Sequence, residues 1–255
     1  MSKAPHIPLS SVLAQVEAVV GYLRVSASAA ADSGHDDWLS CATLVDTPGR
    51  LAEVVRSTMA GRGTQQESVA ASLFVQSYAF RIGALVLAPY ALGLPTPGCA
   101  PADTYVRLTR HRPGAVAVTD PEVHDHSVDQ LVGVLLGRHL APLITATTSA
   151  VTIGRRLLWG NVAASCAAVF RAIEGAEGVD RVAVRDRADA FFVASASWLQ
   201  GLGWFETVLA EPGERRRWQR TNCCLYYQCT GAAKCDDCSL DRLSGLSSVN
   251  VEVSA

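Results

Sequence analysis

The segment at residues 66–92 places the strongest constraint on how this chain can fold. Its sequence, ESVAASLFVQSYAFRIGALVLAPYAL from Glu67 onward, is apolar at most positions. A helix that is apolar on most sides must be buried on most sides. The chain has 255 residues, enough for one large domain or two small ones, and either would bury a sizeable core without disulfides. We therefore expect a long helix inside a helical body.

The remaining periodicity also favours helices, so the predicted fold class is mainly α (α+β). Thr47 and Pro48 carry helix-start signals, and Ser127 with Gln130 has the spacing of a capping box. The expected helices cover residues 11–25, a stretch from 47 onward, 127–173 with a weak point at Pro142, and 182–199. The polar residues 33–37 are expected to form a loop.

Two further segments complete the predicted organisation. Residues 104–120 alternate and contain Pro113-Gly114, which predicts a small β-hairpin that turns at this dipeptide. Residues 201–206 are expected to turn the chain. We divide the chain into a mainly helical body at residues 1–210 and a C-terminal cysteine-rich segment at residues 211–255.

Composition and charge limit the cellular setting. Charged residues make up only 18% of the chain, below the ~25% of average soluble domains. The net charge of −2 gives no case for a nucleic-acid surface. We expect no signal peptide, and the apolar run at residues 82–95 is shorter than the ~20 residues that span a bilayer. The expected location is the cytoplasm, and an apolar face would allow peripheral membrane contact at most.

The densest chemical signal is TNCCLYYQCTGAAKCDDCS, residues 221–239, which holds five of the eight cysteines. Cytosolic thiols stay reduced, so clustered cysteines there indicate metal or redox chemistry. Cys223 and Cys224 are poor disulfide partners, because neighbouring Cα atoms lie ~3.8 Å apart and disulfides need ~4.4–6.8 Å.

The spacing leaves two kinds of metal site open. Cys235 and Cys238 form a C-x-x-C pair that can hold one ion, but the side chains of the neighbouring Cys223 and Cys224 diverge. A 2Fe–2S cluster, which presents two irons to four thiolates, accommodates such a pair. Zinc sites usually separate each cysteine pair by two to four residues. An iron–sulfur cluster is favoured, with zinc as the alternative.

The pattern C-C-x10-C-x2-C near a C-terminus resembles the FhuF family of ferric-siderophore reductases. It is carried here by Cys223, Cys224, Cys235 and Cys238, with arginines before the pair and CCLYY after it. Residues 157–165, LLWGNVAAS, are similar to a Trp-Gly-Asn helix segment of that family. The resemblance covers roughly residues 68–239 and implies a 2Fe–2S cluster held by the four cysteines. It makes residues 1–210 a siderophore-binding body and residues 211–255 a cluster-binding segment.

The resemblance also implies an activity, the one-electron reduction of a ferric siderophore in the cytosol. Siderophores hold Fe(III) with hard oxygen donors, and an added electron weakens that hold. Hydroxamates bind Fe(III) less tightly than catecholates, so a hydroxamate is expected. The sequence shows no dinucleotide fingerprint. We therefore expect a separate electron donor, such as a ferredoxin or a flavoprotein reductase.

Several residues near the motif are candidate contacts for the siderophore or the cluster. The arginines could tune the cluster potential or dock an anionic partner, but they could also form a solvated helix face. The aromatic residues could equally pack in the core, and Gly160 could simply allow close helix packing. The candidates are Arg215, Arg216, Arg217, Arg220, Trp159, Asn161, Tyr226 and Tyr227.

Two departures from the family pattern bear on the site. Cys229 lies inside the spacer, and we expect it to pack as a small apolar residue or to stay free, with ligation as the alternative. Asp236 and Asp237 separate the last two cysteines and would lower the cluster potential. Two other functions remain open: a siderophore-binding or iron-handling protein with a structural zinc or cluster, and an iron or redox sensor.

Overall fold

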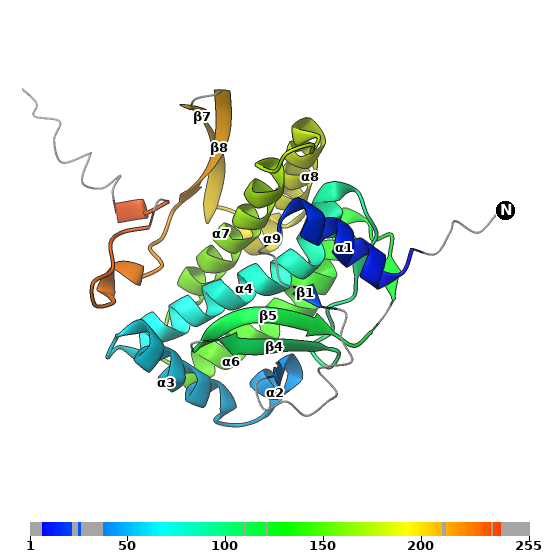
Figure 1. Cartoon of the computed structure of the whole chain (residues 1–255). Coiled ribbons are helices and arrows are strands. Elements are labelled where there is room, and N and C mark those ends of the chain that lie inside the picture. The colour runs from blue at the N-terminus through cyan, green and yellow to red at the C-terminus, as the bar shows by residue number, and fades with distance from the viewer. Residues whose placement is uncertain are drawn as a thin grey trace, which may run out of the picture.

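The computed structural model is mainly helical with small sheets, which confirms the predicted fold class (Figure 1). It describes residues 7–21, 25–26, 38–109, 111–120, 122–210, 213–235 and 237–240. The loop expected at residues 33–37 lies outside this part of the chain.

The expected long helix is α4, Glu67–Leu92, and it forms the centre of the body. It runs between helix α7, Arg155–Glu174, and strand β5, Arg112–Val118 (Figure 1). Neighbours on both sides explain why its apolar residues are buried around nearly the whole circumference. Gly93 ends the helix in a left-handed conformation with a φ of 72°, which glycine adopts without steric cost.

The first helix is shorter than the predicted range 11–25, and the next region contains two helices instead of one. Helix α1 covers Leu9–Val19, and helices α2 and α3 cover Cys41–Asp46 and Arg50–Arg62. The predicted helix start at Thr47 and Pro48 is wrong, because these residues lie between α2 and α3. Gly49, with a φ of 80°, precedes the first residue of α3.

The helical region after residue 127 begins as predicted and then departs from expectation. Helix α5, Val128–Val132, has the expected capping box between Ser127 and Gln130. The next eight residues, Gly133–Leu140, form a wider π-helix before α6, Ala141–Ala150. Pro142 has no backbone N–H to donate to the preceding turn, which favours such a local change.

The helix expected to continue to residue 173 is interrupted after α6. Val151 is extended, with φ −137° and ψ 139°, and α7 starts four residues later. The helical region is therefore disturbed at two places, as a π-helix just before Pro142 and as a full interruption at residues 151–154.

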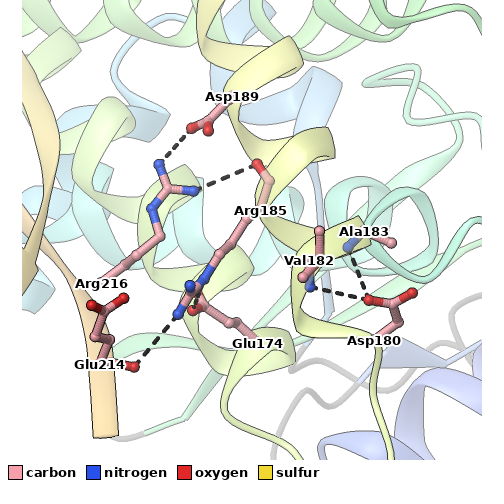
Figure 2. A network of polar contacts seen from close by, with 8 residues as sticks. All are labelled: Glu174, Asp180, Val182, Ala183, Arg185, Asp189, Glu214 and Arg216. Carbon is pink, nitrogen blue, oxygen red and sulfur yellow. Dashed lines mark hydrogen bonds and ion pairs between the residues drawn. The ribbon is translucent and has the colours of Figure 1, made fainter.

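Helices α8 and α9, Arg181–Ala194 and Ala196–Leu199, lie close to the range predicted for a single helix. Asp180 caps α8, since its carboxylate accepts hydrogen bonds from the backbone N–H groups of Val182 and Ala183, both at 3.1 Å (Figure 2).

The predicted hairpin is present within a larger sheet. Strands β4, Thr104–Thr109, and β5 pair antiparallel, and the order of the sheet is β1-β5-β4-β2. The short edge strands are β1, Val25–Ser26, and β2, Trp38–Ser40. The chain reverses before β5, and Pro113 and Gly114 lie inside that strand, so the predicted position of the turn is wrong. Strands β3, Thr96–Pro97, and β6, Val123–His124, form a separate pair.

A second hairpin was not predicted. Strand β7, Gly203–Ala210, pairs antiparallel with β8, Gly213–Arg220, and the hairpin projects from the helical body (Figure 1). The turn expected at residues 201–206 is therefore largely strand, and the arginine run lies on a strand and not on a helix face. The domain boundary expected after residue 210 falls between these two paired strands.

A polar group is buried in the helical core. His139 is fully buried, its Nε2 lies 2.6 Å from the Tyr78 hydroxyl, and its Nδ1 contacts the Cys99 carbonyl. The Nδ1–H group donates to the carbonyl, and Nε2 accepts from the hydroxyl. Burial lowers the pKa of His139 to about 4, so the imidazole is neutral near pH 7.

Two helical stretches pass the length and composition criteria for a membrane span, Glu67–Leu92 and Val128–Ala150. The apolar window of the first is 78% buried inside the protein, as a core helix requires, and that of the second is 50% buried. The structure is compatible with a soluble protein.

Candidate metal centre

The cysteine segment, residues 221–240, packs on one end of the helical body and is drawn in orange in Figure 1. The Thr230 hydroxyl donates to the Gly63 carbonyl at 2.7 Å, and the Thr230 N–H donates to the same oxygen at 3.2 Å. The Ser72 hydroxyl on α4 donates to the Cys224 carbonyl at 2.7 Å. Contacts with α3 and α4 thus fix the backbone around the cysteines.

Gly160 of the Trp-Gly-Asn segment explains how this segment approaches α7. A Cβ atom at Gly160 would lie 1.8 Å from Oδ1 of Asn222, far inside van der Waals contact. The Asn222 side-chain amide instead reaches the Leu157 carbonyl at 3.2 Å. Gly160 therefore allows close packing, which was one of the two interpretations of this segment. The residue that packs against it is Asn222, directly before Cys223.

The two ends of the motif meet at one pair of sulfur atoms. Cys224 Sγ lies 3.6 Å from Cys235 Sγ. Two thiolates on one tetrahedral ion, with metal–sulfur bonds of ~2.3 Å, are separated by ~3.8 Å. Burial raises the pKa of the Cys223 thiol, and Cys238 adds to this rise as a nearby thiol. The neighbouring cysteines are thus directed to different partners.

The local backbone produces this divergence. Leu225 has a φ of 67°, a left-handed conformation that a bulky residue rarely adopts, and its N–H donates to Cys223 Sγ at 3.3 Å. At the other end, the Cys238 N–H donates to the Cys235 carbonyl at 3.0 Å and closes the C-x-x-C turn. All eight cysteines are free thiols.

This donor set fits a binuclear cluster in its chemistry. Four soft thiolates are the ligands of a 2Fe–2S centre, in which each iron takes two cysteines. Within the described residues, no group of three or more Cys, His, Asp or Glu side chains gathers closely enough to hold a single ion. Four thiolates suit zinc as well as a binuclear cluster in their chemistry, so the donor set is compatible with both.

Arg220 supplies positive charge next to the sulfur pairs. It is 1% exposed, and its Nε lies 3.2 Å from Oδ2 of Asp237. The pKa of Cys224 lies below its ordinary value, because Cys235 hydrogen-bonds to its sulfur and Arg220 favours the thiolate. The same hydrogen bond raises the pKa of Cys235. The site stabilises negative charge on Cys224.

The guanidinium of Arg220 can donate further hydrogen bonds. Its Nη1 is buried and has no hydrogen-bond partner within the described part of the chain. An unsatisfied buried donor costs about 1–3 kcal/mol. A thiolate or sulfide acceptor at the sulfur pairs would remove that cost, so the arginine fits an anionic cluster beside it.

Asn161 connects this arginine to the central helix. Its Oδ1 accepts from Arg220 Nη2 at 3.1 Å, and its Nδ2 donates to the Ser72 hydroxyl at 2.8 Å. Ser72 in turn holds the Cys224 carbonyl. Asn161 therefore acts on the site through Arg220 and Ser72, and not through a sulfur atom.

The other predicted arginines differ in their surroundings. Arg216 pairs with Asp189 on α8 at 2.5 Å (Figure 2). Its guanidinium carbon also lies 4.0 Å from the centre of the Phe205 ring. Arg216 thus ties the hairpin to the body. Arg215 is exposed, and Arg217 pairs with Glu206 across the hairpin at 3.3 Å. Because strand positions alternate, these arginines do not form one surface.

The aromatic candidates also differ from one another in their surroundings. Trp159 is 8% exposed and packs on Trp198 with a ring-centre distance of 5.0 Å, which is core packing. Tyr227 is 41% exposed, and its hydroxyl contacts its neighbour Gln228. Tyr226 is half-buried beside the cysteines. Cys229 is buried in a small apolar cluster, as expected for a packing residue.

A cavity of about 550 Å³ opens beside one sulfur pair, and we call it the arginine cavity. The cysteine segment lines it with Cys224, Tyr226, Cys235 and Asp237. The body and hairpin line it with Arg62, Arg81, Arg112, Arg171 and Arg217. Sequence reasoning found only Arg217 among these arginines, since the others are scattered along the chain and carry no local motif.

A comparison with known proteins adds no further constraint: no family model matches the chain, and no curated protein is detectably similar to it.

Proposed function

We propose that this protein is a cytoplasmic, iron–sulfur-dependent reductase of ferric siderophores that serves iron homeostasis. The observation that carries the proposal is the position of Cys224 and Cys235. Their sulfur atoms are 3.6 Å apart, as on one metal ion, and both residues line a cavity of about 550 Å³. Cavities of roughly 300–1,000 Å³ hold small ligands. The resemblance of the cysteine pattern to the FhuF family supports the same activity.

Cys223, Cys224, Cys235 and Cys238 would hold a 2Fe–2S cluster, which supplies one electron when it is bound in its reduced form. Arg220 offsets part of the negative charge of the four thiolates, and Asp237 holds the guanidinium in place. Ser72 and Asn161 fix the backbone and the arginine, so the sulfur pairs keep their geometry.

The electron balance requires one external donor. A reduced ferredoxin or flavoprotein gives one electron to the protein, and the protein passes it to the Fe(III) chelate in the arginine cavity. Iron leaves as Fe(II), because the hard oxygen donors of a siderophore hold the less charged ion weakly. The wall formed by Cys224 and Cys235 brings the chelate next to the thiolates, which shortens the path for this transfer.

Single-turnover reduction tests the proposal. Protein reconstituted with iron and sulfide is reduced with dithionite, freed of excess reductant under nitrogen and mixed with a ferric chelate. Released Fe(II) is trapped by a coloured Fe(II) chelator. We expect about one Fe(II) per cluster.

Two cysteine variants form a matched pair for this assay. Cys238→Ser removes a proposed ligand and should abolish Fe(II) release. Cys229→Ser changes a cysteine packed among Val69 and Leu73 and should retain release. Equal release by wild type and Cys238→Ser would refute the ligand assignment, and a protein that binds zinc and releases no Fe(II) would favour a siderophore-binding role.

A further inference from the structure

The walls of the arginine cavity carry a marked excess of positive charge. Five arginines and one carboxylate, that of Asp237, line it among the described residues. The carboxylate is already paired with the buried Arg220 at 3.2 Å. It therefore neutralises little of the charge that faces the cavity.

Three of these arginines, Arg112, Arg171 and Arg217, are weakly engaged. The other two have partners: Arg62 donates to the Ser77 hydroxyl at 3.3 Å, and Arg81 lies over the Phe80 ring. Arg217 pairs with Glu206 on the exposed hairpin surface, where ion pairs contribute little. Arg112 and Arg171 are exposed, and neither pairs with an acidic side chain in the described part of the protein. These groups remain able to bind an anion.

Two buried polar atoms of cavity-lining residues lack partners. Arg62 Nε and Gln76 Oε1 are both buried without a hydrogen bond to any described residue. Both atoms lie behind the cavity surface, so a ligand in the cavity would contact the exposed arginines and not these two atoms.

We propose that the arginine cavity binds an anionic ferric chelate of the α-hydroxycarboxylate (citrate) type, in preference to a neutral tris-hydroxamate. This inference rests on the proposed reductase function and names its substrate class. The planar guanidinium donates two parallel hydrogen bonds to a carboxylate. A neutral chelate gains nothing from the positive charge. The sequence-based expectation of a hydroxamate stays untested, and the charge of the cavity favours the other class.

The charge also suits the redox step. When the protein passes one electron to Fe(III), the bound chelate becomes more negative by one charge and the cysteine centre becomes less negative by one. Arginines around the chelate stabilise the side that gains the negative charge. Leu73, Phe80 and Tyr226 add apolar wall for the carbon backbone of the chelate.

Gallium(III) chelates test this without any redox step, since Ga(III) resembles Fe(III) in size and charge and is not reduced. Isothermal titration calorimetry compares the gallium complex of a citrate-based chelator with that of a trihydroxamate, on protein carrying its cluster. We expect the anionic complex to bind at least about tenfold more tightly, with an affinity that falls as salt rises.

Substitutions locate the binding site. Arg112→Gln and Arg171→Gln should each weaken the anionic complex by about tenfold and leave the weak binding of the neutral complex unchanged. Arg155→Gln is the matched control, because Arg155 is an exposed arginine on the same helix as Arg171 and lies outside the cavity wall. It should change neither affinity.

The results separate this inference from the proposed function. Tighter binding of the neutral complex, or no loss in the Arg112 and Arg171 variants, would overturn the inference even if Fe(II) release is normal. Unchanged chelate affinity with a raised KM for a reduced ferredoxin would assign the arginines to donor docking and would also overturn it. Selective gallium binding by a protein that releases no Fe(II) would support the ligand class and refute the reductase.

Discussion

Gly160→Ala is expected to destabilise the protein at the contact that holds the cysteine segment against α7. The new Cβ would lie 1.8 Å from Oδ1 and 2.4 Å from Cγ of Asn222. Asn222 must then move, and its 3.2 Å hydrogen bond to the Leu157 carbonyl is lost. The substitution adds one methyl group and changes no charge.

The magnitude follows from three terms. Overpacking costs about 1–3 kcal/mol, and the lost hydrogen bond costs ~1 kcal/mol. Alanine gains ~1 kcal/mol over glycine inside a helix. The net loss is about 1–3 kcal/mol, which corresponds to a fall in Tm of roughly 3–10 °C for a chain of this size.

Chemical and thermal unfolding measure this loss, with Gly83→Ala as the control. Gly83 lies inside α4, and the nearest atoms to a Cβ there are 3.7 and 3.8 Å away, which is ordinary contact. Gly83→Ala should be neutral or stabilising. Adding Asn222→Ala to Gly160→Ala should recover stability relative to Gly160→Ala alone. A stable Gly160→Ala protein, or a double variant weaker than both single variants, would refute the packing argument.

Two further predictions concern charge. His139 has a pKa of about 4 in the folded protein against 6.5 when unfolded, so the unfolded chain binds more protons between these values. The free energy of unfolding should therefore fall by about 3 kcal/mol as the pH drops from 6.5 to 4. Denaturant titrations should show this slope, and it should flatten in His139→Gln. At the metal centre, Arg220→Gln should lower the cluster potential and Asp237→Asn should raise it. Each shift is on the order of 90 mV for a charge ~8 Å away at an effective dielectric of ~20. A redox titration of each variant measures the shift in cluster potential. Shifts of the same sign in the two variants would contradict the electrostatic argument.

Local signals in the sequence predicted much of the helical body. The apolar density of residues 66–92 identified the central helix, and Ser127 with Gln130 gave a correct capping box. The same local reasoning misplaced the break after α6. Pro142 marked the change from the π-helix to α6, but nothing local marked the full interruption at residues 151–154.

The second hairpin was missed because its arginine run suggested a solvated helix. Strand β8 instead buries Trp218 between the more polar positions 217 and 219, and pairs it across the hairpin with Phe205. The Glu-Pro-Gly turn signal between two alternating segments could have identified it.

The candidate site was predictable only in its local part. The cysteine spacing indicated the proposed ligands, but the pairing of Cys224 with Cys235 depends on the backbone at Leu225. The arginine cavity joins Arg62, Arg112 and Arg171, which come from three separate elements. Sequence spacing holds no information about such a long-range arrangement.

The most direct test of the central claim is an optical and EPR spectrum of protein purified without oxygen, recorded before and after dithionite. The account predicts a visible chromophore that bleaches on reduction, together with a new spin-half signal from a 2Fe–2S cluster. Both features should be absent in Cys238→Ser and present in Cys229→Ser. A colourless, EPR-silent wild-type protein that contains zinc would contradict the account.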